Sequence, residues 1–291
     1  MTVRPMADTD VEAAGNVQVA AFMDLDRRHG VKPRPVTDVV WQRIHTRLRH
    51  FTVHDPDGSW VAVDDADTVI GCALALKRDT LWGLSLLAVD PTTQSSGVGR
   101  RLLDTSLTYA ADCDRAIILS SPDPRAIRSY ATSGFALYPQ VESAGEPDRS
   151  RIPALDGRGR EGSVADVELA DGIDRSVRGA PRGPDQIRLA TDTTMFVVDD
   201  ASGRGYGYVR SDGEILAIAA TDDATATDLL WRCFAHAAEI ETPVSIIAMN
   251  AEQQWAISTS FTARLKVSPG GPVFWRGAAP PAAYLPSGAY L

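Results

Sequence analysis

Hydrophobic positions in the first half of the chain follow two patterns, one typical of buried strands and one typical of amphipathic helices. Leu84–Val89 is a short apolar run without polar alternation, which predicts a buried strand. From Gly99 onward, apolar residues recur three and four positions apart, which predicts a helix. Arg115–Ser120 predicts a second buried strand. A further helix is expected from Pro124 to Gly134, because proline suits a first helical turn and glycine suits a helix end.

Earlier segments supply further strands and helices of the same kind. A first strand is expected at Thr2–Met6, and two helices are expected at Val11–Phe22 and Thr37–Leu48. Trp60–Val63 and Val69–Leu76 predict a hairpin. This order of strands and helices predicts an α/β fold (α+β, with a mixed sheet) in which helices cover the sheet.

A glycine-bearing loop, Gln94–Gly99, separates the predicted strand at Leu84–Val89 from the helix after it. Glycine lets the backbone approach a ligand closely, and a helix start presents unpaired N–H groups to an anion. The spacing fits neither the dinucleotide motif nor the nucleotide-triphosphate motif, because each needs a different arrangement of glycines. Strand, loop and helix therefore predict a phosphate site of another kind.

Two stretches of this sequence resemble the signatures of one enzyme family. The pattern Gln-x-x-Gly-x-Gly at Gln94–Gly99, shortly after Val-Asp-Pro, resembles the acyl-CoA-binding motif of the GNAT superfamily of N-acetyltransferases. Asp123–Phe135 is similar to a second GNAT signature, in which a tyrosine stands four residues before Gly-Phe, as Tyr130 does before Gly134. Because both signatures occur in the family's order, roughly residues 2–140 are identified as a GNAT-like acyl-CoA transferase domain.

The resemblance implies a site for acetyl-CoA as acyl donor, without a metal. In GNAT relatives the backbone of the glycine loop holds the pyrophosphate, and the preceding strand pairs with the pantetheine arm. These cofactor-binding roles carry over to Leu87, Ala88, Val89, Gln94, Ser95, Ser96, Gly97, Val98, Gly99, Arg100, Asp123 and Arg125. Tyr130 is the implied catalytic acid, because a protonated phenol can donate to the departing thiolate. Asp123 departs from the family's pattern, since relatives often carry asparagine there.

The general base is the open part of this mechanism. An alkylamine has a pKa of about 10.4 and must lose a proton before it attacks. Many GNAT relatives use a carboxylate near the signature strand, but Leu84–Leu87 offers none. The tail Ala282–Leu291 is one candidate, since some multidomain relatives place the terminal carboxylate in the active site; packing along a domain interface is its alternative. The side-chain candidates are Asp24, Asp26, His29, Asp79 and Glu142.

Basic residues gather where this fold usually builds its acceptor pocket, around the first two helices. Only Asp26 and Asp38 oppose them. Such a rim could favour an acceptor that carries a carboxylate or phosphate; solvated helix faces are the more common cause of this pattern. The basic residues are Arg27, Arg28, Lys32, Arg34, Arg43, Arg47 and Arg49.

The length of 291 residues suits two domains of ordinary size. Residues 146–163 are polar and carry proline and glycine, which predicts a linker between domains at residues 1–145 and 164–291. The second half repeats the first weakly, since Phe196–Ala201 echoes Val61–Ala66.

The repeat extends to the strand and helix that flank the predicted phosphate loop. Glu214–Ala219 matches the signature strand, and Ala224–Ile240 matches the helix that follows it. The loop between them, Ala220–Ala224, has two acids and no glycine, so it would repel a pyrophosphate. Ser260-Phe261 stands where the first half has Gly134-Phe135. The chain is therefore expected to hold tandem GNAT-like domains, of which the second is degenerate and non-catalytic.

Composition narrows the function classes. The formal net charge of −9 argues against a nucleic-acid-binding protein. Three widely spaced cysteines and the lack of a signal-peptide pattern predict a reduced, cytoplasmic protein. No apolar run approaches the roughly 20 residues that span a bilayer, so no membrane association is expected. The five histidines lack partners at metal-ligand spacing.

The expected function is transfer of an acetyl group from acetyl-CoA to a primary amine of a small molecule by direct attack. One alternative keeps the fold but uses another acyl group, or an acceptor like that of the tandem mycothiol synthases. The other alternative is a non-catalytic acyl-CoA-binding regulator whose second domain docks a partner. The identity of the acceptor and the choice between monomer and homodimer stay open.

Overall fold

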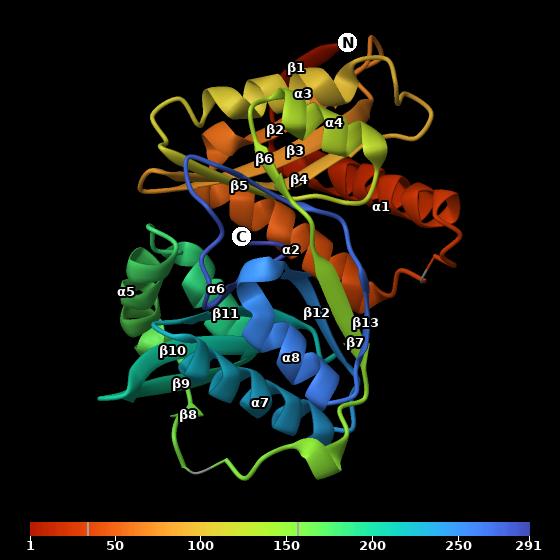
Figure 1. Ribbon diagram of the computed structural model, residues 1–291. Coiled ribbons are helices and arrows are strands. Elements are labelled where there is room, and N and C mark those ends of the chain that lie inside the picture. The colour runs from red at the N-terminus through yellow and green to blue at the C-terminus, as the bar shows by residue number, and fades with distance from the viewer. Residues whose placement is uncertain (34, 156) are drawn as a thin grey trace. The chain divides into compact units, whose positions relative to one another are not determined.

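The computed structural model describes residues 1–33, 35–155 and 157–291 of the chain (Figure 1). These residues form two compact units, Met1–Ile118 and Leu119–Leu291. Arg34, which the sequence analysis assigned to the basic rim, lies outside the described residues. Among the helices of the described ranges, none combines the length and the apolar composition that crossing a membrane requires.

The first unit is built on a mixed sheet whose strands lie side by side in chain order. Strands β1 to β4 are joined antiparallel, whereas β4 and β5 run parallel because a helix crosses between them. The arrangement confirms the predicted fold class. The strands are β1 (Thr2–Pro5), β2 (Ser59–Val63), β3 (Val69–Arg78), β4 (Leu81–Val89) and β5 (Arg115–Leu119).

Helices cover both faces of this sheet. Cys72 of β3 faces α1, where its thiol lies 3.8 Å from the carbonyl oxygen of Ala14. The next residue, Ala73, packs with Leu102 of α3 on the opposite face, as the alternation of a strand requires. The helices are α1 (Val11–Arg28), α2 (Asp38–His54) and α3 (Val98–Thr108). The helix α2 continues past its predicted end at Leu48 because Phe51 is fully buried on the same face.

Strand β4 carries the irregularity that matters most for function. Leu86 pairs with Leu74 and Leu84 pairs with Ala75, so Ser85 is an extra residue in a β-bulge. The pairing between β4 and β5 covers Leu81–Leu84 only. Beyond the bulge, among the described residues of the first unit, β4 pairs with β3 alone and its other edge is unpaired.

The second unit begins with the helix that carries Tyr130. It also contains two small groups of paired strands. The strand β6 (Ala136–Tyr138) pairs antiparallel with β14 (Val273–Arg276). A central strand, β7 (Val141–Gly145), pairs antiparallel on its two sides with strands far along the chain, which ties the start of this unit to its end. The remaining elements are α4 (Pro124–Thr132), β12 (Val244–Met249) and β13 (Lys266–Pro269).

A five-stranded antiparallel sheet in the order β15-β11-β10-β9-β8 forms the rest of the second unit. The helix α7 packs on β9, β10 and β11 (Figure 1). Its buried face includes Leu229, Leu230 and Phe234, which make this unit's main core. The strands are β8 (Arg160–Glu161), β9 (Thr194–Asp200), β10 (Gly203–Val209), β11 (Ile215–Ala220) and β15 (Tyr284–Leu285). The helices are α5 (Val167–Val177), α6 (Pro184–Asp192), α7 (Asp223–Glu239) and α8 (Gln254–Thr262).

The order of elements repeats along the chain. Two helices are followed by three antiparallel strands, a helix, a further strand and a helix, first from α1 to α4 and again from α5 to α8. In this order β11 corresponds to β4, and α7 corresponds to α3. The predicted strand and helix of the second half therefore both exist, within one residue of the expected bounds.

Candidate functional site

The loop between β4 and α3 ends in a helix start that no side chain caps. Gly97 precedes α3 in the left-handed region, with φ 91° and ψ −2°. A side chain is disfavoured in that conformation, which accounts for glycine here. No side chain of the described residues accepts a hydrogen bond from the first turn of α3 at this cap. The free N–H groups and the positive end of the helix dipole suit a phosphate oxygen.

Hydrogen bonds inside the loop shape it. The Gln94 amide donates to the carbonyl oxygen of Val89 across 3.2 Å, so this side chain folds back on the loop. The Asp90 carboxylate accepts the backbone N–H of Thr92 at 2.9 Å and turns the chain directly after β4. Ser95 also has a positive φ, of 67°. The predicted loop residues Gln94, Ser95, Ser96, Gly97, Val98 and Gly99 therefore form one continuous turn into α3.

The side chains of the β4 residues that precede the loop take part in packing. Leu87 and Val89 pack toward Val98 and Leu102 of α3. Ala88 is buried on the other face of the sheet. Because their side chains are engaged, the groups available on the unpaired edge of β4 are main-chain amides and carbonyls, which suit the amides of a pantetheine arm.

Arg100 lies on the first turn of α3 with its side chain half exposed. Its guanidinium pairs with Asp104 one turn later, at 2.9 Å. An exposed pair of this kind contributes little to stability, so the arginine can exchange this partner for a phosphate at small cost.

A pair of residues that the sequence analysis did not connect lies at the bulge of β4. Arg47 of α2 donates through Nε and Nη2 to the Ser85 hydroxyl, at 3.2 and 2.6 Å, and through Nη2 to the Ser85 carbonyl oxygen. The sequence places Arg47 in a general basic rim, and Ser85 lies within the segment Leu84–Val89 that is predicted as a buried apolar strand. The signal that could have joined them is that single polar residue in the buried strand.

Asp123, Arg125 and Tyr130 lie in the second unit, on α4 and directly before it. The Asp123 carboxylate caps the helix by accepting the backbone N–H of Arg125 at 2.9 Å. The Arg125 guanidinium also pairs with this carboxylate, at 2.8 Å. Asp123 is therefore a helix cap here, which an asparagine could also be.

Tyr130 is the predicted acid, and its surroundings keep it protonated. Its side chain is buried and packs edge-on against Phe274, with ring centroids 5.5 Å apart. Burial, together with the negative charge of Asp123, raises the pKa of the phenol above its ordinary value. A neutral phenol at all physiological pH values can donate a hydrogen bond to a developing thiolate.

Three of the candidate bases have partners within their own unit. Asp24 is ion-paired with Arg28 at 2.8 Å on α1. The imidazole of His29 lies 2.9 Å from the carbonyl oxygen of Leu25. The main-chain oxygen of Leu291, at the end of the tail, accepts from buried Arg182 at 3.1 Å. The base stays an open prediction. Among the described residues, no group of three or more histidine, cysteine or acidic side chains is placed to hold a metal ion.

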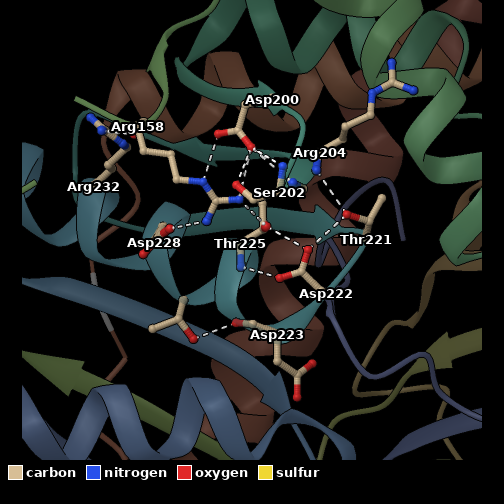
Figure 2. Close-up of polar contacts among 12 residues, drawn as sticks. Arg158, Asp200, Ser202, Arg204, Thr221, Asp222, Asp223, Thr225, Asp228 and Arg232 are labelled. Carbon is tan, nitrogen blue, oxygen red and sulfur yellow. Dashed lines mark hydrogen bonds and ion pairs between the residues drawn. The ribbon is translucent and has the colours of Figure 1, made fainter. Parts of the chain in front are cut away.

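The corresponding helix start in the second unit is occupied by the protein itself (Figure 2). Asp222 caps α7 by accepting the backbone N–H of Thr225 at 2.8 Å. Arg158 lies over this cap and donates to the Thr225 hydroxyl at 3.0 Å, to Asp200 at 2.9 Å and to Asp228 at 2.6 Å. A carboxylate of the chain thus stands where the first unit leaves N–H groups free.

The corresponding strand edge is occupied as well. Tyr284 and Leu285 of β15 pair with Ala219 and Ile218 of β11. The residue before them, Ala283, accepts a hydrogen bond from the backbone N–H of Ala220 at 3.0 Å. These are the positions of β11 that correspond to Leu87, Ala88 and Val89 of β4.

The counterpart of Tyr130 differs from the sequence expectation. The helix α8 continues to Thr262, and the left-handed residue after it is Arg264, with φ 60°. Arg264 therefore corresponds to Gly134, whereas the sequence predicts that Ser260 does. The backbone N–H of Leu265 bonds to the carbonyl of Ser260, as that of Phe135 does to Tyr130, so Ser260 replaces the tyrosine.

Residues 25–135 match the acetyltransferase (GNAT) family. Three solved structures share the fold. A putative acetyltransferase from Pyrococcus horikoshii is 16% identical, with a TM-score of 0.76 over 99% of this chain and 95% of that one. A GCN5-related N-acetyltransferase from Kribbella flavida is 14% identical, with a TM-score of 0.58 over 94% and 70%. A probable N-acyltransferase from Enterococcus faecalis is 13% identical, with a TM-score of 0.58 over 94% and 72%. No curated protein matches the chain.

Proposed function

Because the chain carries an acetyltransferase domain of the GNAT family at residues 25–135, we propose that it transfers an acetyl group from acetyl-CoA to a primary amine of a small molecule. The observation that carries this proposal is the uncapped start of α3 after Gly97, next to the unpaired edge of β4. Together they offer donors for a pyrophosphate and a strand edge for the arm that follows it.

In the proposed reaction the neutral amine attacks the thioester carbonyl carbon, forming a C–N bond, and the C–S bond then breaks. The two electrons of that bond leave with sulfur, which takes up a proton. Tyr130 supplies this proton or a strong hydrogen bond to the departing sulfur, and the nitrogen loses its extra proton to a base or to water. A main-chain amide near Val89 donates to the carbonyl oxygen while it carries negative charge.

We further propose that the second half is a degenerate GNAT-like domain without chemistry of its own. In this proposal the catalytic domain comprises residues 1–145 and the second domain residues 164–291, with residues 146–163 between them. Asp222 at the start of α7 and Ser260 at the tyrosine position support the proposal that only the first domain is catalytic.

Release of free thiol from acetyl-CoA in the presence of a panel of primary amines tests the activity. Tyr130→Phe keeps the ring against Phe274 and removes the proton, so kcat is expected to fall about 100-fold while KM for acetyl-CoA changes less than about threefold. Tyr138→Phe makes the same chemical change on β6 and serves as the control. An unchanged kcat in Tyr130→Phe would remove this residue from the acid role.

The same assay separates the alternatives. Faster turnover with a longer acyl-CoA, or with an amino-sugar thiol precursor, would favour a different donor or acceptor on the same fold. Calorimetric binding of coenzyme A without turnover on any amine would favour a regulator, which the unassigned base makes the second candidate.

A further inference from the structure

Arg47 makes an unusual set of contacts for a residue on a helix face. Its guanidinium binds both polar groups of one residue, the hydroxyl and the carbonyl oxygen of Ser85. The two residues are 38 positions apart in the chain. The contact joins α2 to β4 at the extra residue of the bulge, where the strand alternation is interrupted.

The bulge marks the point where β4 leaves β5. Leu84 is the last residue of β4 paired with β5, opposite Ile118. Ser85 follows at once, and Leu87 to Val89 then form the edge to which the proposed function assigns the pantetheine arm. A small rotation at Ser85 would move every amide on that edge.

The second unit shows that the bulge does not need an arginine in order to form. Tyr208 pairs with Ala217 and Val209 pairs with Ile215, so Leu216 is the extra residue there, at the position that corresponds to Ser85. Leucine offers no side-chain acceptor. In that unit the edge beyond the bulge is fixed by β15, which pairs two and three residues further along β11.

We propose that Arg47 is a positioning residue for the acyl donor: it holds the bulge at Ser85 so that the free edge of β4 keeps the geometry that the pantetheine arm requires. This inference rests on the proposed use of acyl-CoA. In the second unit a strand of the protein supplies the restraint, and in the first unit Arg47 supplies it without covering the edge.

The side-chain chemistry fits this role. The planar guanidinium presents several N–H donors in fixed directions, so it can hold a carbonyl and a hydroxyl at the same time. Lysine offers one flexible ammonium group and holds a single orientation less well. Arg47→Lys should therefore restore the charge without restoring the full effect.

The test compares a ligand that carries the arm with a fragment that lacks the arm and one phosphate of the pyrophosphate. Acetyl-CoA carries the pantetheine arm, and 3′,5′-ADP, a fragment of coenzyme A, lacks it. Isothermal titration is expected to show that Arg47→Ala weakens acetyl-CoA binding about tenfold and changes 3′,5′-ADP binding less than about twofold, since the loop at Gln94–Gly99 is untouched. Ser85→Ala, which keeps the carbonyl contact, should lose only a few-fold for acetyl-CoA.

A double-mutant cycle and a matched control complete the experiment. In the double variant the two losses should be less than multiplicative, because Arg47 and Ser85 act through one contact. Val53→Ala shortens an exposed side chain of the same helix and should leave both affinities unchanged. Thermal unfolding of each variant reports whether the fold is retained, and Ser85→Ala keeps the test valid if Arg47→Ala does not fold.

Three outcomes would overturn the inference: equal losses for both ligands, no loss for either, or a loss confined to the KM of the amine. The last would make Arg47 an acceptor-binding residue. Wild-type protein that binds acetyl-CoA without turnover would overturn the proposed function alone, because the comparison of the two ligands still applies. Wild-type protein that binds neither ligand would overturn both.

Discussion

Two segments of this molecule have the same local architecture and opposite contents. Both β4–α3 and β11–α7 consist of a bulged strand, a turn and a helix. In the first, within its own unit, the helix start has no side-chain cap and the strand edge beyond the bulge has no partner. In the second, a carboxylate caps the helix and a strand covers the edge. The difference is one of occupancy rather than of fold: in the second segment the chain's own atoms lie where the first segment, within its own unit, leaves room for the proposed ligand.

Under the proposed function, the occupants of the second segment take the places that the parts of an acyl-CoA molecule would take in the first. The Asp222 carboxylate places negative charge at the start of α7, as a phosphate would. The strand β15 offers main-chain amides to the edge of β11, as a pantetheine arm would.

The largest expected effect comes from giving the first loop the charge of the second. Gly97→Asp places a carboxylate before α3, where it would repel the pyrophosphate, and affinity for coenzyme A is expected to fall at least about 100-fold, or roughly 2.7 kcal/mol. A Cβ at this position meets no atom within 4 Å, so crowding does not contribute. Isothermal titration measures the affinity.

The matched control for this variant is Gly97→Asn. Asparagine has the same shape and tolerates the left-handed conformation, but it carries no charge. It shares the backbone strain of the aspartate, so its loss of affinity should stay below about tenfold. Equal losses in both variants would show that conformation, rather than charge, distinguishes the two loops.

The next effect concerns the strand that covers the second edge. Leu285 of β15 is 2% exposed and belongs to the main core of its unit. Leu285→Ala is expected to lower the free energy of unfolding by about 2–4 kcal/mol, because it leaves a cavity beside β11. Urea unfolding followed by tryptophan fluorescence measures this, since Trp231 and Trp255 lie in the same core.

The control for this change is Ile187→Ala on α6, where the side chain is 50% exposed and the expected change stays within about 0.5 kcal/mol. Affinity for coenzyme A should be unaffected in both variants. A loss of affinity in Leu285→Ala would contradict the assignment of β15 to a structural role.

A smaller effect is expected at the cap of α7. Asp222→Ala should cost about 1 kcal/mol of stability, and Asp222→Asn should cost less, because asparagine also caps a helix. Burial opposes ionisation of Asp222, but hydrogen bonds from Thr225 and Thr221 outweigh it and hold its pKa below the ordinary value. The folded state thus favours the charged form.

The pH dependence of this cap follows from that direction. The stabilisation is present above the ordinary aspartate pKa of about 3.9 and is lost as the pH falls through the lower folded value. The stability difference between wild type and Asp222→Ala, measured by urea unfolding, should therefore be constant from pH 5 to 7 and shrink below about pH 4. A difference that grows toward low pH would contradict the role of the ionised carboxylate.

The sequence predicted those features that local spacing encodes. Glycines at fixed positions before an amphipathic helix were enough to find the loop at Gln94–Gly99, and acids in place of glycine identified the different loop at Ala220–Ala224. Features that depend on distant residues were missed. The contact between Arg47 and Ser85, and the pairing of β15 with β11, join segments whose separation leaves no periodic signal. The offset at Ser260 arose because Arg264 adopts a left-handed conformation that sequence spacing assigns to glycine.

The smallest expected effect concerns the pH dependence of kcat. It depends on Tyr130, whose counterpart in the second unit is Ser260. Burial first, and the charge of Asp123 second, raise the pKa of Tyr130, so the protonated form of the acid persists above the ordinary phenol value of about 10. The rate kcat at saturating substrates should thus fall less than about twofold between pH 9 and 10, while deprotonation of the amine tends to increase it. Fixed-time assays of acetyl transfer between pH 9 and 10 measure the dependence of kcat on pH. The Tyr130→Phe variant should show a curve of the same shape at a lower rate. A descending limb centred below pH 9 that disappears in Tyr130→Phe would show that the phenol titrates far lower than its buried position allows. The functional difference between Tyr130 and Ser260 would then have a cause other than donation of a proton by the phenol. The Ser260 hydroxyl lies 3.0 Å from that of Ser143.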